Sequence, residues 1–184
     1  MRIFANLVEK AALSGLPFLI IGGNAVIAYG YPRRTIDVDL LVREVDRRAW
    51  DALLLSLGFR QHQIARSFHM YNPTESGCPP VDLMLVNEST FKKLSEGAME
   101  VEFEGALAHM PSLVHLIALK LHALRSGAEH RYPRDLSDVA TLIQINKVDL
   151  ASADYAEILE RYATPTIVAE IRSLLAGSRP SSAG

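Results

Sequence analysis

Residues 21–42 read IGGNAVIAYGYPRRTIDVDLLV and join a pair of glycines to a stretch that carries two aspartates. The apolar run before the glycines, residues 17–21, is short enough to be a buried strand. Residues 24–29 then have helical character, and residues 35–42 are rich in the β-branched residues that favour a central strand. The sequence therefore predicts the order strand, glycine turn, short helix and strand.

The rest of the chain follows the same reasoning from hydrophobic periodicity and from glycine and proline positions. We expect further strands at residues 59–65, 68–71, 81–86 and 99–104, where the sheet is expected to end, and helices at residues 2–14, 45–57, 88–96, 111–126, 134–145, 151–161 and 165–175. This pattern predicts an α/β (α+β) protein with a mixed central sheet flanked by helices. We expect a core at residues 1–110, an all-helical region packed on it at residues 111–176, and a disordered tail at residues 177–184.

Composition narrows the class of protein. The 184 residues carry a formal net charge of -2, which argues against a surface that binds nucleic acid over its whole extent. Cys78 is the single cysteine, so neither an intrachain disulfide nor a cysteine metal cluster can form, which fits a reducing cytoplasm. The N-terminal residues resemble an amphipathic helix rather than a signal peptide, and we expect no membrane segment.

The two aspartates of the expected strand, Asp37 and Asp39, are two residues apart and so should lie on one face. Like charges this close repel each other, and a divalent cation removes that cost. Asp82 opens a second apolar strand and is the natural third carboxylate. An isolated Asp-x-Asp is more often part of a solvated loop, and Asp82 could instead cap a turn after Pro79 and Pro80.

The glycine pair, Gly22 and Gly23, has two readings. Glycine lets backbone N–H groups approach a ligand closely, so this pair could hold phosphate oxygens at the start of the following helix. It could equally be a plain tight turn. The position of the pair shortly before Asp37 and Asp39 favours a phosphate cradle beside a metal site.

On these residues the chain resembles the nucleotidyltransferase superfamily, whose signature is a Gly-Gly or Gly-Ser turn followed by a strand with Asp-x-Asp. Within it, residues 15–145 look most similar to AbiEii-type toxin nucleotidyltransferases and related small bacterial proteins. The resemblance implies the nucleotidyltransferase fold and an enzyme that transfers a nucleoside monophosphate from an NTP to a hydroxyl with release of pyrophosphate.

The resemblance also assigns roles to single residues. It implies catalytic, metal-binding carboxylates at Asp37, Asp39 and Asp82, and nucleotide binding by Gly22, Gly23, Asn24, Lys120, Asp135 and Asp138. Asn24 stands where many members carry Ser or Thr. Lys120 could instead be a lysine whose stem lies in the core while its ammonium reaches water. Asp135 could instead stabilise a helix N-terminus.

We therefore expect a cytoplasmic, Mg²⁺-dependent nucleotidyltransferase with a two-metal site, with Mn²⁺ as the alternative ion. The acceptor could be a tRNA end, a protein or a small molecule, and the chain could be the toxin of a toxin–antitoxin pair with an antitoxin as partner. A second reading is a catalytically silent module that binds nucleotide or a partner, which Asn24 and the short chain favour. A third is an unrelated α/β binding domain with structural aspartates.

Overall fold

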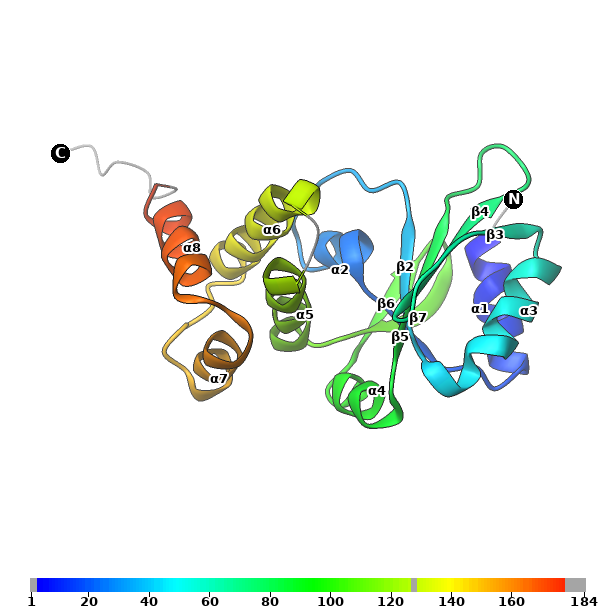
Figure 1. Cartoon of the computed structure of the whole chain (residues 1–184), viewed down its shortest axis with the longest axis horizontal. Helices are drawn as coiled ribbons and strands as arrows, with labels where there is room; N and C mark the ends of the chain where they lie inside the picture. Colours follow the sequence, from blue (N-terminus) through cyan, green and yellow to red (C-terminus); the bar gives the residue numbers. More distant parts are fainter. Residues whose placement is uncertain (1–2, 127–128, 178–184) are drawn as a thin grey trace. The chain divides into compact units, whose positions relative to one another are not determined.

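The computed structural model describes residues 3–126 and 129–177 of the chain. These residues form two compact units (Figure 1). The first unit runs to Ala28 and resumes over Arg33–Ser112, while the second contains Tyr29–Pro32 and the chain from Leu113 onward.

The first unit is built on a five-stranded sheet in the order β1-β2-β5-β4-β3. In chain order, its strands are β1 (Phe18–Ile20), β2 (Val38–Arg43), β3 (Phe59–Ile64), β4 (Phe68–Pro73) and β5 (Val81–Val86). β2 and β5 pair in parallel, and the other neighbours pair antiparallel. The mixed central sheet predicted from the sequence is confirmed.

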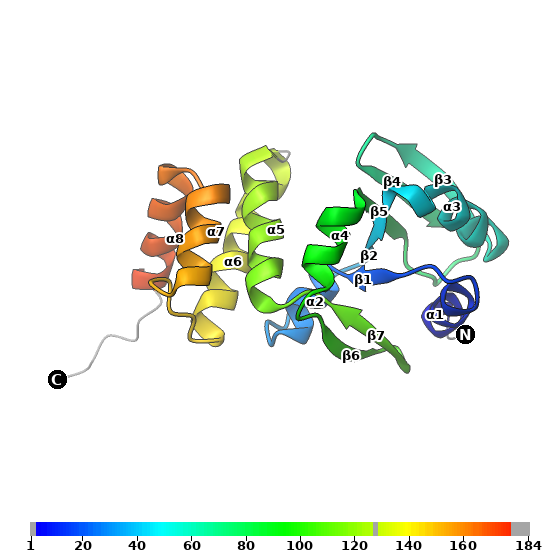
Figure 2. The same ribbon diagram turned by 90° about the horizontal axis from the view of Figure 1, so that it is seen from below.

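Helices α1 (Ile3–Leu13) and α3 (Arg47–Ser56) cover one face of this sheet. The ring of Phe18, which shares its face with Val42, meets Phe4 of α1 at 6.5 Å and Trp50 of α3 at 5.7 Å, both edge to face. Trp50 is fully buried, so this apolar contact anchors α3. Figure 2 shows helix α2 (Gly22–Ala28) on the other side of the sheet.

A short 3₁₀ turn, Glu44–Asp46, leads from β2 into α3. Helix α4 (Glu88–Ser95) follows β5 and starts at Asn87, whose side-chain oxygen accepts a hydrogen bond from the Thr90 amide at 2.8 Å. This is the usual cap that satisfies a free amide in the first turn of a helix.

The expectation that the last strand would end near residue 104 is wrong. β6 (Met99–Phe103) turns back into β7 (Ala106–Met110), and the two form a separate antiparallel pair. The turn consists of Glu104 and Gly105, both with positive φ of 48° and 81°. Positive φ at both central residues marks the two-residue turn that best matches the twist of a hairpin.

The second unit is helical in the part of it that the structure describes. Its helices are α5 (Leu113–Ser126), α6 (Tyr132–Ile145), α7 (Ala153–Tyr162) and α8 (Pro165–Gly177), with a 3₁₀ turn at Glu129–Arg131. The Tyr29–Pro32 segment belongs to this unit, and the side-chain amide of Asn146 donates to the Tyr29 carbonyl at 3.2 Å. Of the expected tail at residues 177–184, Gly177 is the last residue of α8, and residues 178–184 lie outside the described residues. Over residues 3–126 and 129–177, no helix combines the length and the apolar character needed to cross a bilayer.

Candidate metal centre

Three aspartates of the first unit converge. The carboxylates of Asp37, Asp39 and Asp82 each offer an oxygen within 4.8 Å of those of the other two, and all three residues are half-buried. The spacing of these residues in the sequence predicts that the three meet, and the structure brings them together. That they bind a metal stays a prediction.

The backbone ladder of the sheet fixes two of the three. Asp39 of β2 lies directly beside Asp82 of β5 in the parallel register. Val38 and Leu40, which flank Asp39 in β2, are 3% and 0% exposed and point to the opposite face, which α1 and α3 cover. The alternation of a strand therefore places both carboxylates on the face that carries α2.

Asp37 is held differently. The sequence predicted a strand from residue 35, but β2 begins at Val38, so Asp37 lies just outside the strand. The Thr35 hydroxyl donates to Asp37 Oδ1 at 2.7 Å, and the Asn24 amide donates to the Asp37 carbonyl at 2.9 Å. Two side-chain hydrogen bonds thus fix the residue where no strand pairing does.

The glycine pair is the start of α2 rather than a turn before it, which corrects the expected helix start at residue 24. A Cβ built on Gly22, whose φ is +61°, would lie 1.8 Å from Asp39 Oδ2. A Cβ on Gly23 would lie 2.5 Å from Thr35 Oγ1. Because these contacts are impossible for real atoms, the missing side chains give the room in which Asp39 and Thr35 sit.

This arrangement fits a hard divalent cation. All three donors are carboxylates, and oxygen ligands are those that Mg²⁺ and Ca²⁺ take. Three negative charges within 4.8 Å repel each other, and a bound cation of charge +2 converts that repulsion into attraction. A side chain at position 22 would occupy the place of Asp39 Oδ2, so the glycine there leaves room for this carboxylate.

The other predicted nucleotide residues lie in the second unit. Lys120 of α5 places its ammonium 2.6 Å from Asp135 Oδ1 and 2.8 Å from Asp138 Oδ2, both on α6. The three side chains are 7%, 4% and 1% exposed. The ammonium is therefore buried between two carboxylates. The alternative prediction, a lysine whose ammonium reaches water, is wrong. The role of these residues in nucleotide binding stays a prediction.

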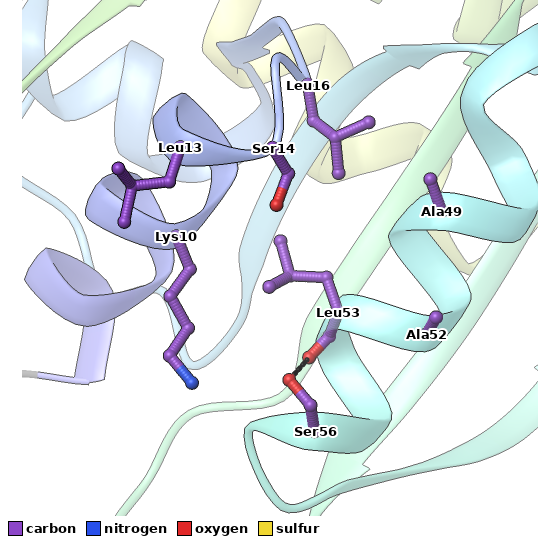
Figure 3. A pocket seen from close by; sticks show the side chains of 8 residues that line it. All are labelled: Lys10, Leu13, Ser14, Leu16, Ala49, Ala52, Leu53 and Ser56. Carbon is purple, nitrogen blue, oxygen red and sulfur yellow. Dashed lines mark hydrogen bonds between the residues drawn. The ribbon is translucent and has the colours of Figure 1, made fainter.

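A groove of about 470 Å³ lies between α1 and α3 (Figure 3). Its walls are formed by Lys10, Leu13, Ser14, Leu16, Ala49, Ala52, Leu53 and Ser56. Since α1 and α3 cover the face opposite Asp39 and Asp82, this groove is separate from the carboxylates. Its walls carry no carboxylate, so it is not where a divalent cation would bind.

Sequence reasoning missed one residue of the site, Thr35, and missed the contact that Asn24 makes. Short polar side chains often bond to groups two to four residues away along the chain, and the Thr35–Asp37 spacing is a signal of this kind. The bond from Asn24 spans thirteen residues and depends on α2 lying beside β2, so the sequence alone held no signal for it.

Comparisons with known proteins identify a family and a fold. The model of a family described as uncharacterised nucleotidyltransferase matches residues 2–176. No curated protein sequence matches the chain.

Solved structures with the same fold include three with low sequence identity. The antibiotic-resistance factor ANT(2'')-Ia is 16% identical over 95% of this chain and 88% of its own, with a TM-score of 0.57. The lincosamide antibiotic adenylyltransferase LnuA, solved with lincomycin, is 12% identical over 76% of this chain and 96% of its own, with a TM-score of 0.54. An antigenic nucleotidyltransferase-like protein from Paracoccidioides brasiliensis is 18% identical over 91% and 89%, with a TM-score of 0.53. At these identities the likeness shows the fold.

Proposed function

This chain belongs to the family of uncharacterised nucleotidyltransferases. We propose that it transfers a nucleoside monophosphate from an NTP to the hydroxyl of an acceptor, and that the reaction takes place at the carboxylates of Asp37, Asp39 and Asp82. The observation that carries the proposal is the convergence of these three carboxylates within 4.8 Å. Family membership makes nucleotide transfer the reaction to test. The three carboxylates also support it, because Mg²⁺ takes oxygen ligands and typically binds substrate phosphates together with one or two carboxylates.

In the proposed reaction, an oxygen of the acceptor hydroxyl bonds to the α-phosphorus, and the bond from that phosphorus to the bridging oxygen breaks. Pyrophosphate leaves, and the hydroxyl proton passes to a carboxylate, for which Asp82 is our candidate. Asp37 and Asp39 would hold Mg²⁺, or Mn²⁺ in its place, with Asp82 as third ligand. Two such ions when bound would supply the positive charge that stabilises the attacking and leaving oxygens.

The nucleotide would be held near Gly22 and Gly23, and the resemblance to the superfamily adds Asn24, Lys120, Asp135 and Asp138 as nucleotide-binding residues. For the acceptor, we propose a small molecule with a free hydroxyl as the first class to screen, ahead of a tRNA end or a protein. Two fold neighbours support that order: LnuA was solved with lincomycin, and ANT(2'')-Ia with adenylyl-2''-tobramycin.

The finer parts of the proposal rest on the resemblance in the sequence. We propose that the chain is close to AbiEii-type toxins, that it acts in the cytoplasm, and that a cognate antitoxin is its partner. Co-expression with a neighbouring open reading frame that relieves growth arrest would support the toxin role.

The first test is calorimetric titration of Mg²⁺, with and without each NTP, into the wild type and into Asp39→Asn. This change keeps the size of the side chain and removes its charge, and we expect metal affinity to fall at least about tenfold, or about 1.4 kcal/mol. Glu100→Gln is the matched control, because Glu100 is an exposed carboxylate on β6 and its loss should change nothing.

Equal metal affinity in the wild type and Asp39→Asn would contradict the proposal. Metal and nucleotide binding that both depend on Asp39, with no product on any acceptor in a radiolabelled transfer assay, would instead favour the silent binding module.

A further inference from the structure

We infer that Thr35 and Asn24 are positioning residues that fix Asp37 for metal binding. The inference rests on the proposed function, because it assigns both residues to the same carboxylate site. It concerns Asp37 alone among the three aspartates, since Asp39 and Asp82 are held by the ladder between β2 and β5.

Asp37 needs such support because of where it lies in the chain. Residues 31–36, which precede it, form no helix or strand. Ile36, its immediate neighbour, is 76% exposed. A carboxylate at the end of an irregular segment would sample several positions, and a metal would then have to order it at a cost in affinity.

Thr35 fixes the side chain of Asp37. Its hydroxyl donates to Oδ1 at 2.7 Å, which orients the carboxylate and leaves Oδ2 for a cation. Thr35 is itself confined, because its Oγ1 and Cβ lie 2.5 Å and 2.8 Å from the place where a Cβ of Gly23 would be. The buried Gly23 thus lets the threonine pack against the first turn of α2.

Asn24 fixes the backbone of Asp37. Its side-chain amide donates to the Asp37 carbonyl at 2.9 Å, which ties the first turn of α2 to the start of β2. The inference therefore gives Asn24 a role that needs an amide donor and no contact with the nucleotide. A hydroxyl at this position would be one bond shorter and could not reach the same carbonyl without a shift of the backbone.

The expected loss of metal affinity can be taken from metal sites in general. Groups that hydrogen-bond to metal ligands typically change metal affinity about 10- to 100-fold when they are removed. We therefore expect Thr35→Val, which replaces the hydroxyl by a methyl group of similar size, to weaken metal binding by about that factor. Thr35→Ser keeps the hydroxyl and should restore most of the affinity.

The test titrates Mn²⁺ alone into the full chain and follows free Mn²⁺ by electron paramagnetic resonance. The variants are Thr35→Val, Thr35→Ser, Asn24→Leu and Asp39→Asn, and circular dichroism checks that each is folded. Thr74→Val is the matched control: the Thr74 hydroxyl donates to the Gly58 carbonyl at 2.6 Å, so its removal breaks a similar bond that involves none of the three aspartates. The expected result is loss of affinity in Thr35→Val and Asn24→Leu, recovery in Thr35→Ser, and no change in Thr74→Val.

Three results would overturn the inference. If Thr35→Val and Asn24→Leu bind Mn²⁺ like the wild type while Asp39→Asn does not, the metal site stands and the positioning role fails. If Thr35→Ser is as weak as Thr35→Val, the hydroxyl is not the determinant. If the wild type binds no better than Asp39→Asn, the proposed function fails, and the inference fails with it.

Discussion

Gly22 shows how a single residue can decide whether the carboxylate site forms. Its φ of +61° is a conformation that side chains other than glycine adopt at a cost, and its missing Cβ leaves the space that Asp39 Oδ2 occupies. The glycine is therefore required twice, once by the backbone and once by the neighbouring strand. A phosphate cradle, the role expected from the sequence, would be a third use of the same residue and stays a prediction.

We predict that Gly22→Ala weakens metal binding more than its cost in stability alone would suggest. The new methyl group would lie 1.8 Å from Asp39 Oδ2, so the carboxylate has to move out of the cluster. Positive φ adds a destabilisation of about 1–3 kcal/mol. Urea unfolding and Mn²⁺ titration of the same variant measure the two effects separately.

Gly15→Ala is the matched control for this prediction. Gly15 has a nearly identical φ of +63°, and nothing lies within 4 Å of a Cβ placed there. Both variants should lose stability through backbone strain, and only Gly22→Ala should lose affinity for the metal. Equal metal affinity in the two variants would show that Asp39 does not depend on the space at Gly22.

At the scale of elements, the contact between α5 and α6 is centred on a buried charge. Lys120 lies between Asp135 and Asp138 and, with side chains at most 7% exposed, all three are removed from water. Leu121 of α5 and Leu142 of α6 are fully buried and apolar. In such surroundings, removal of one partner leaves a buried charge without compensation.

We predict that Lys120→Met destabilises the protein by about 3–5 kcal/mol, the usual cost of breaking a buried ion pair. Adding Asp135→Asn and Asp138→Asn to this variant should recover much of the loss, because the remaining groups are neutral. Urea unfolding monitored by circular dichroism gives both numbers. Lys93→Met is the control, since Lys93 is an exposed lysine of α4.

A loss below about 1 kcal/mol for Lys120→Met, as expected of an exposed pair, would mean that the ion pair contributes little to the fold. The buried lysine would then be free to serve the nucleotide-binding role that the resemblance implies. A large loss of stability shows that any such role is added to a structural one.

Sequence patterns predicted the elements that bury an apolar face. Residues 81–86 are a short apolar run, and residues 113–126 repeat apolar side chains with a period of about 3.6. The structure has these segments as β5 and α5. β7 was missed because its five residues, ALAHM, lead directly into Pro111 and lack a clear alternation of polar and apolar side chains. Glu104 and Gly105 lack the Asn-Gly or Asp-Gly pair that is the strongest hairpin signal in a sequence, so the turn is recognised from their positive φ in the structure.

The candidate site divides in the same way. Asp39 and Asp82 could be placed on one face from strand alternation, because the sheet then decides the direction of each side chain. That their strands are parallel neighbours in register is a property of the whole sheet. The same alternation predicts Asp37 on that face, but the strand starts after Asp37, and hydrogen bonds from Thr35 and Asn24 hold it instead.

At the scale of the whole molecule, both units contain tyrosines that lose their proton less easily in the folded chain than in the unfolded chain. In the first unit, burial and the hydrogen bond that the Tyr71 hydroxyl donates to Asp51 raise the pKa of Tyr71 well above its usual value of 10. In the second unit, burial raises the pKa of Tyr29 to about 12 and also raises the pKa of Tyr155. The hydrogen bond to Glu170, 2.6 Å long, raises the pKa of Tyr132.

These shifts predict that the free energy of unfolding falls as the pH rises above about 10. Tyrosines of the unfolded chain lose their protons near pH 10, whereas the folded chain keeps them until the higher folded pKa is reached. The folded state then binds more protons than the unfolded state, so the free energy of unfolding decreases with pH. The slope is at most about 1.4 kcal/mol per pH unit for the fully buried Tyr71 and smaller for the three partly exposed tyrosines, whose charges water screens. Urea unfolding at pH 7, 9, 10 and 11 measures the slope, and Tyr71→Phe tests its cause.

The Tyr71→Phe variant loses the bond to Asp51 at every pH, so it should be less stable at pH 7 but show a flatter decline above pH 10. Parallel declines in Tyr71→Phe and the wild type would mean that the ionisation of Tyr71 is not linked to folding.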